Sequence, residues 1–170
     1  MLSKDVVKQI NDQINKEFYS AYFYLNVANY YTAQNLDGFA NWFLVQAKEE
    51  ESHAMLFLQY LQNNGEEVIL QPIQVAEGNY KDFKEPLVDT LQHEKFVTDS
   101  IHSIYALAFE KKEFRTTQFL EWFIKEQGEE EKSAEDLINK YELFATDGKG
   151  LYLLDTELAA RVYTPPTLVL

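Results

Sequence analysis

Four long segments of this chain repeat an apolar residue every three or four positions, and carboxylates interrupt each repeat near its middle. The repeat is that of one face of an α-helix, and it predicts helices over residues 5–33, 37–63, 82–112 and 117–146. Each apolar face has to be buried against another element. We therefore expect an all-α fold in which four helices pack as a bundle.

The lengths of the links predict how these helices are ordered. Residues 34–36 and 113–116 are short connections, so the helices that each joins should be antiparallel neighbours. Residues 66–81 have no helical period and contain Pro72 and Gly78. A stretch of this length can reach about 50 Å, whereas a helix of about 28 residues is only about 42 Å long. The second and third helices should therefore be parallel, joined by one crossover along the whole bundle.

The C-terminal part is predicted to be separate from the four long helices. Residues 147–150 form a glycine-containing break, and Pro165 and Pro166 end the pattern that follows. We expect the bundle over residues 1–146, and a linker, a short fifth helix and a tail over 147–170. The stripe of the fifth helix is expected to comprise Leu151, Leu154, Leu158 and Val162.

Polar residues stand in the apolar stripes at similar heights in all four predicted helices. The midpoints of the helices fall near residues 19, 50, 97 and 130, so one layer at half height should hold every intruding side chain, whichever way each helix runs. The intruding residues are Glu17 in the first helix, Glu50 and His53 in the second, Glu94 in the third, and Gln127 and Glu130 in the fourth.

Such a layer predicts a metal site. Burying several carboxylates together is very costly unless a cation neutralises them. Glu50 and His53 are three residues apart on one helical face, so both can bind the same ion. Carboxylate-bridged di-iron bundles take a Glu from each of two helices and a Glu-x-x-His pair from each of the other two. Here one such pair is intact, and Gln127 and Glu130 occupy the positions of the other.

The composition of the chain limits the classes of partner that it can bind. The formal charge is −13, which disfavours binding to nucleic acid or to an anionic membrane and favours cations. Cysteine is absent, so disulfides and thiolate metal sites are excluded. The sequence starts without an export signal, and we expect a cytoplasmic protein. His93 and His102 lie off the predicted stripes and are expected to make ordinary polar contacts at the surface.

Five short motifs carry a family resemblance. They are Glu17 with Tyr24, Glu49-Glu50-Glu51-Ser52-His53, Glu94, Trp122-Phe123-Ile124-Lys125-Glu126-Gln127 with Glu129-Glu130, and Gly148-Lys149-Gly150-Leu151-Tyr152. On these motifs the sequence resembles the non-haem ferritins of prokaryotes over essentially its whole length. The resemblance implies a ferritin-like bundle, iron storage in a shell of 24 identical subunits, and oxidation of Fe²⁺ by O₂ or H₂O₂ at a di-iron ferroxidase centre.

The resemblance also implies a role for each site residue. Glu17, Glu50 and His53 would bind the first iron, while Glu50 would bridge to a second iron bound by Glu94 and Glu130. Gln127 would lie near the second iron, and Tyr24 would hydrogen-bond a ligand or supply an electron. The third, weaker site that the resemblance implies would comprise Glu49, Glu126, Glu129 and Glu130.

Other functions are compatible with a four-helix bundle. A haem-containing bacterioferritin would have a haem-ligating Met at position 51, where this chain has Glu51, and a second Glu-x-x-His motif. We therefore expect no haem. A cage subunit that nucleates iron without oxidising it, or a metal-free interaction module, would not need the full set of buried ligands.

Overall fold

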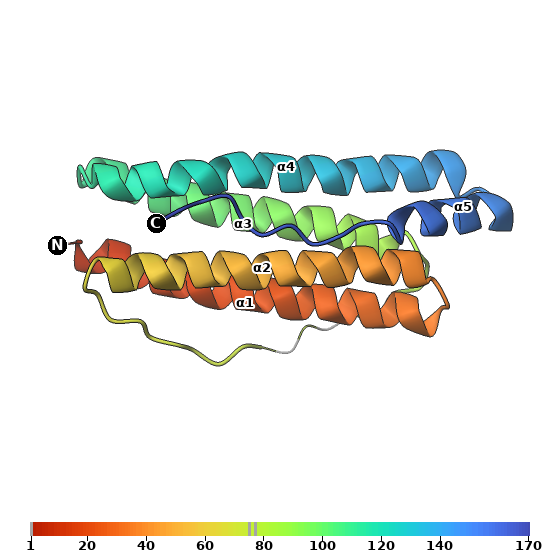
Figure 1. Cartoon of the computed structure of the whole chain (residues 1–170), viewed down its shortest axis with the longest axis horizontal. Helices are drawn as coiled ribbons and strands as arrows, with labels where there is room; N and C mark the ends of the chain where they lie inside the picture. Colours follow the sequence, from red (N-terminus) through yellow and green to blue (C-terminus); the bar gives the residue numbers. More distant parts are fainter. Residues whose placement is uncertain (1, 75, 77) are drawn as a thin grey trace.

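A computed structural model describes residues 2–74, 76 and 78–170 as five α-helices, with no strand in that part of the chain. Four long helices lie side by side as a bundle, and a short fifth helix packs at one end (Figure 1). The predicted all-α bundle with one crossover and a fifth helix is confirmed. The helices are α1 (Lys4–Ala33), α2 (Asp37–Asn63), α3 (Glu85–Glu110), α4 (Phe114–Phe144) and α5 (Gly148–Leu158).

The crossover link between α2 and α3 runs along the outside of α1 and α2 from one end of the bundle to the other (Figure 1). Side-chain amides of α1 hold it there. The Asn11 amide donates to the carbonyl of Glu67 at 3.1 Å and accepts from the backbone N–H of Ile69 at 2.7 Å. Asn15 donates to the carbonyl of Pro72 at 3.2 Å. These bonds satisfy backbone groups that no regular structure pairs, so the extended link has a defined path.

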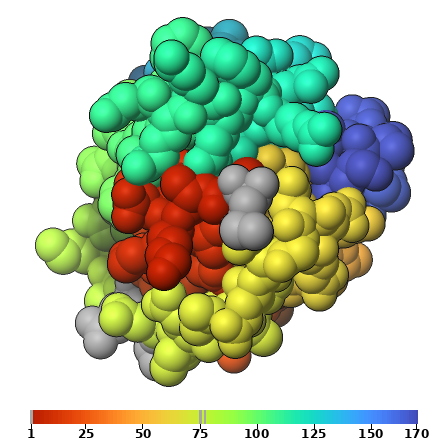
Figure 2. Space-filling view, turned by 90° about the vertical axis from the view of Figure 1, so that its left-hand side faces the viewer, coloured from red at the N-terminus to blue at the C-terminus, as the bar shows by residue number. Residues whose placement is uncertain are grey.

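The N-terminal end of the bundle is closed by contacts between segments that are distant in the sequence. At the N-terminal end, the start of α1 lies between the start of α4 and the crossover link (Figure 2). The backbone N–H of Ser3 donates to Glu113 at 2.7 Å, and that of Leu2 donates to Glu66 at 3.3 Å. Ser3 stands at the N-cap position of α1, but its hydroxyl makes no capping bond to the helix.

The starts of α3, α4 and α5 differ from the prediction. α4 begins at Phe114 rather than at residue 117, since the Glu113 carbonyl already accepts from the Thr117 N–H at 3.1 Å. α3 begins at Glu85 rather than Asp82, because the Asp82 carboxylate accepts from the N–H groups of Lys84 and Glu85 at 2.8 and 3.0 Å and forms a turn before the helix. α5 begins at Gly148, since Asp147 caps it by accepting from the Gly150 N–H at 2.7 Å. The two glycines predicted as a break thus lie in the first helical turn.

The end of α5 also differs from the prediction. The helix stops at Leu158, and Val162 lies beyond it with 79% of its surface exposed. Leu154 and Leu158 are buried against the bundle. Gly38 lets α5 approach α2 closely, because a Cβ at that position would lie 1.6 Å from the carbonyl oxygen of Asp155. The fifth helix is therefore packed on its own subunit.

The core of the bundle is divided into two apolar clusters by the middle of the molecule. One cluster, toward α5, contains aromatic side chains such as Tyr31, Phe39 and Phe43. The other, toward the N-terminus, contains Phe57 and Phe123. On α1 the buried face passes through Tyr24, whereas the neighbouring Leu25 is 41% exposed. None of the described helices combines the length and apolarity that crossing a membrane requires.

Candidate metal centre

The polar residues predicted to share a layer do lie together, between the two apolar clusters. They come from all four long helices, and each has at most 7% of its surface exposed. They point toward the bundle axis because they lie in the apolar stripe of each helix, and they share one height because each lies near the middle of its helix. The six residues are Glu17 of α1, Glu50 and His53 of α2, Glu94 of α3, and Gln127 and Glu130 of α4.

The layer contains two groups of three ligand atoms, and all atoms within a group lie within 4.8 Å of one another. The first group is formed by Glu17, Glu50 and His53, and the second by Glu50, Glu94 and Glu130. Glu50 belongs to both groups. Each group offers the carboxylate or imidazole atoms that a metal ion binds, and the two groups comprise the residues that the family resemblance implies for two irons.

Two buried polar atoms of the first group are available to bind an ion. Among the described residues, Glu17 Oε2 and His53 Nδ1 have no hydrogen-bond partner. The nearest oxygen of Glu50 lies 3.8 Å from His53 Nδ1. An unpaired buried polar atom is costly, so such atoms point to a partner that the protein itself does not supply. Carboxylate oxygens with an imidazole nitrogen suit a divalent transition-metal ion such as Fe²⁺.

Glu94 is held in the second group by hydrogen bonds from two helices. The hydroxyl of Tyr24, on α1, donates to Glu94 Oε1. The amide of Gln127, on α4, donates to Glu94 Oε2 at 3.1 Å. Tyr24 is fully buried, and its hydroxyl reaches the layer through this bond to Glu94. Gln127 faces the second group with its N–H donor, so the orientation of Glu94 is fixed from both sides.

Two glutamines that we did not predict as site residues donate hydrogen bonds to carboxylates of the layer. Gln46 of α2 donates to Glu130 and lies 3.5 Å from Glu50 Oε1. Gln13 of α1 donates to Glu17 Oε1 at 2.7 Å. Each glutamine precedes a site residue of its own helix by one turn, and Gln46 interrupts an apolar stripe. The sequence shows both features, and they could have identified these glutamines as partners of the site carboxylates.

The electrostatics of the layer favour uptake of protons or of a cation. Burial raises the pKa of Glu50 and of Glu130 well above the usual value, and the charge of Glu94 raises both further. Burial also raises the pKa of Glu94 to about 7, although the hydrogen bonds from Tyr24 and Gln127 lower it. The carboxylates therefore hold protons near neutral pH, and a bound cation would displace them.

A third group of ligand atoms lies next to the layer, formed by His53, Glu126 and Glu130. It includes Glu126 and Glu130 of the predicted third site but not the other two carboxylates. Glu49 forms an ion pair with Arg161 at 2.6 Å. Glu129 is mostly exposed and lies 3.3 Å from Lys125. The structure thus brings together only part of the third site.

The two remaining histidines have different environments. His102 is exposed, as predicted. His93 is half-buried and makes a polar contact, since its Nε2 lies 2.8 Å from the Ser20 hydroxyl; its ring packs 4.7 Å from that of Phe23 and 6.0 Å from that of Tyr24. Burial lowers the pKa of His93 to about 4, so the imidazole is neutral.

Comparison of the sequence with known families gives a match to the Ferritin family, described as "Ferritin-like domain", over residues 7–144. A "Probable bacterial non-heme ferritin-like protein" of Haemophilus influenzae is 37% identical over 158 residues, which are 93% of this chain and 96% of that protein. A "Bacterial non-heme ferritin" of Campylobacter jejuni is 37% identical over 155 residues, which are 91% of this chain and 93% of that protein.

Solved structures give the same result for the fold. An open-pore ferritin from the hyperthermophilic archaeon Archaeoglobus fulgidus superposes with a TM-score of 0.93 at 37% identity, over 95% of this chain and all of the other. An engineered closed form of the A. fulgidus ferritin superposes with a TM-score of 0.94, over 96% of this chain and all of the other.

Proposed function

The chain belongs to the non-haem ferritin family of iron-storage proteins, and from that premise we propose that it is a ferroxidase that oxidises Fe²⁺ within each subunit. The observation that carries the proposal is the pair of buried ligand groups that share Glu50. Two ions held side by side can each give up one electron, so O₂ receives two electrons in one encounter. Iron is the substrate and the cargo here.

The two ion sites that we propose are unequal. The first Fe²⁺ would bind Glu17, Glu50 and His53, and its imidazole nitrogen favours the ferrous ion. The second would bind Glu50, Glu94 and Glu130, which offer only hard oxygen atoms. We expect the second site to hold Fe²⁺ more weakly and to favour Fe³⁺ once it has formed.

Protons and electrons balance in the proposed reaction. Two Fe²⁺ ions are oxidised to Fe³⁺, and O₂ takes up two electrons and two protons to give H₂O₂, which can itself oxidise further Fe²⁺. Binding of the ions releases protons from the carboxyl groups whose pKa burial has raised. Tyr24 stands one hydrogen bond from the second ion through Glu94, which is a suitable place to donate a proton or an electron.

Iron would leave the centre toward a third site and a mineral store. Glu130 belongs to both the second and the third ligand groups, so a swing of this carboxylate can transfer an ion between them. We propose that Glu126 and Glu130 receive the ion there and that Glu49 and Glu129 complete the third site. Storage would take place in a shell of 24 subunits in the cytoplasm. Haem is not expected, because Glu51 cannot act as a thioether ligand.

The proposal is tested by stopped-flow oxidation of Fe²⁺ by the parent and by His53→Ala, with His102→Ala as a matched control that removes an exposed imidazole. The parent and the control should oxidise two Fe²⁺ per subunit rapidly, and His53→Ala should lose the rapid phase. A slow oxidation in the parent that accelerates with mineral growth would indicate a nucleating subunit. A parent rate equal to that of buffer would indicate a metal-free module. Native mass measurement tests the shell of 24 subunits.

A further inference from the structure

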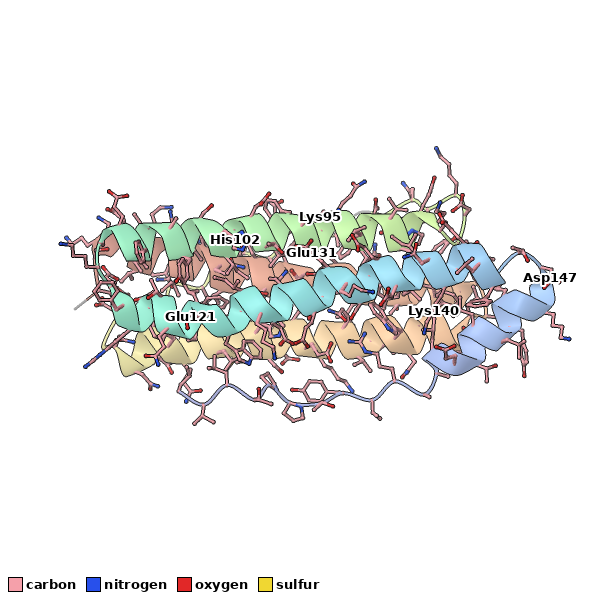
Figure 3. The ribbon with its side chains drawn as sticks, turned by 90° about the horizontal axis from the view of Figure 1, so that it is seen from above. Lys95, His102, Glu121, Glu131, Lys140 and Asp147 are labelled. Atoms are coloured by element: carbon pink, nitrogen blue, oxygen red, sulfur yellow. The ribbon has the colours of Figure 1, made fainter. Side chains whose placement is uncertain are left out.

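The C-terminal tail, residues 159–170, returns from α5 along the outer side of α2 (Figures 1 and 3). On this path it contacts Glu49, one carboxylate of the predicted third site. The guanidinium of Arg161 donates to Glu49 Oε2 at 2.6 Å, and only 25% of the arginine side chain and 20% of the glutamate side chain are exposed. Glu49 is thus already paired with a cation that belongs to the protein itself.

The position of Arg161 is fixed by contacts that do not involve Glu49. The guanidinium lies 4.3 Å from the centre of the Trp42 ring and donates to the Trp42 carbonyl at 3.2 Å. The side-chain amide of Asn41 donates to the carbonyl of Arg161 at 3.0 Å and also to those of Leu158 and Ala159. Backbone and side chain are therefore both anchored to the start of α2.

The tail continues past this point with further anchors. The hydroxyl of Tyr163 lies 2.7 Å from that of Ser52, one turn beyond Glu49 on α2. The indole N–H of Trp122, on α4, donates to Thr167 at 3.3 Å. These are single, partly exposed hydrogen bonds, each of which contributes about 1 kcal/mol. The tail is therefore held in a defined place by bonds that each cost little to break.

We propose that Arg161 is a built-in counter-ion of the third site, so that a metal ion gains Glu49 only when the guanidinium leaves it. A divalent ion bound by Glu126 and Glu130 would face the positive charge of Arg161 across Glu49. The ion would have to displace Arg161 or do without one carboxylate. Either way the third site binds more weakly than the two central sites, and it relays ions rather than retaining them.

This inference rests on the proposed function, because a third site has a role only next to two central ones. The test is therefore a calorimetric titration of the assembled, iron-free protein with Zn²⁺, which is redox-inert and binds the same types of ligand. The variant is Arg161→Gln. The matched control is Arg115→Gln, which removes the same charge at the start of α4, about 16 Å along the helix from Glu126.

Parent and control should bind two Zn²⁺ ions per subunit tightly and a third one weakly. In Arg161→Gln the dissociation constant of the third ion should fall about tenfold, because the ion no longer has to break a partly buried ion pair to gain the Glu49 carboxylate. Arg161→Lys keeps the charge but has only one nitrogen to share between Glu49 and the Trp42 carbonyl, so its third-site affinity should lie between those of the parent and Arg161→Gln. A third-site affinity within twofold of the control in Arg161→Gln would overturn the inference while leaving the two central sites intact. Loss of the two tight sites in the parent would instead refute the di-metal centre.

A second variant separates competition for Glu49 from a general effect of the tail. In a Glu49→Gln background, Arg161 has no carboxylate to neutralise there. Replacing Arg161 by Gln in this background should change third-site affinity much less than in the parent. An unchanged tenfold effect in the double variant would show that Arg161 acts on the ion without Glu49, which would overturn the counter-ion role.

Discussion

The middle layer of the bundle and the apolar clusters on either side of it are built on the same four helices, but they pack opposite kinds of side chain. In the cluster toward the N-terminus, the ring of Phe57 stacks on that of Phe123 at 4.1 Å. Two helical turns before Phe57 on the same face, Glu50 is equally buried and lies among other carboxylates.

The difference shows what each region contributes. An aromatic cluster excludes water and stabilises the fold by burying apolar surface. The layer of carboxylates is costly in the metal-free protein, because like charges and unpaired atoms are taken out of water together. The clusters hold the helices in register, and this register makes the layer possible. The predictions below test this division, in order of the expected change in free energy.

Phe57→Ala should lower the free energy of unfolding of the subunit by about 3 to 5 kcal/mol, since a fully buried ring that contacts Phe119 and Phe123 is removed. Chemical denaturation followed by circular dichroism measures the change. Glu50→Ala is the comparison, because it shortens a side chain on the same face of the same helix. If both variants lost stability equally, the two regions would not differ in the way proposed.

Glu50→Ala should slow the initial oxidation of Fe²⁺ about 100-fold or more, roughly 3 kcal/mol in the activation barrier, because both ion sites lose their shared ligand. Its metal-free stability should stay level or rise, since the substitution relieves repulsion within the layer. Stopped-flow absorbance and denaturation of the same preparation measure the two quantities. Oxidation at the parent rate in the first seconds would contradict the assignment.

The stability of the metal-free protein should fall as the pH rises from about 5 to about 8. The pKa of Glu94 is raised to about 7 in the folded chain, so this group binds a proton more strongly when folded than when unfolded. Its contribution to stability is complete below pH 4.5 and is lost as the pH passes 7, a change of about 2 to 3 kcal/mol. Glu50 and Glu130 act in the same direction.

Thermal unfolding across this pH range measures the slope, with and without saturating Zn²⁺. Zn²⁺ should abolish the contribution of the layer, because the ion replaces the protons. Glu94→Gln, which keeps the shape but cannot ionise, should flatten the slope of the metal-free protein. An unchanged slope in Glu94→Gln would exclude Glu94 as its source.

Gln46→Met should have the smallest effect, a loss of about 1 kcal/mol in the free energy of binding the second ion. The substitution keeps the length of the side chain and removes the donor that orients Glu130. Zn²⁺ titration measures the affinity, and Gln118→Met on the exposed side of α4 is the control. Equal second-site affinities in the two variants would mean that Gln46 does not position Glu130.

The sequence by itself determined the helices, their order and the polar layer. Helical periodicity identifies the face that turns inward, and the length of the crossover link allows only a parallel arrangement of α2 and α3. Because the polar residues lie near the midpoint of each helix, they meet at one height regardless of helix direction. This argument brought Glu17, Glu50, His53, Glu94, Gln127 and Glu130 together; their roles as iron ligands remain predictions.

The tertiary structure alone decided which side chains complete the layer and what covers it. Helical periodicity predicts the direction in which a side chain points from its own helix. It does not predict which atom of a neighbouring helix lies opposite that side chain. The packing of His93 against Phe23 and the bond from Gln46 to Glu130 were therefore not predicted. The tail that carries Arg161 to Glu49 has no periodicity at all, and its path is set by contacts with residues more than 100 positions away in the chain.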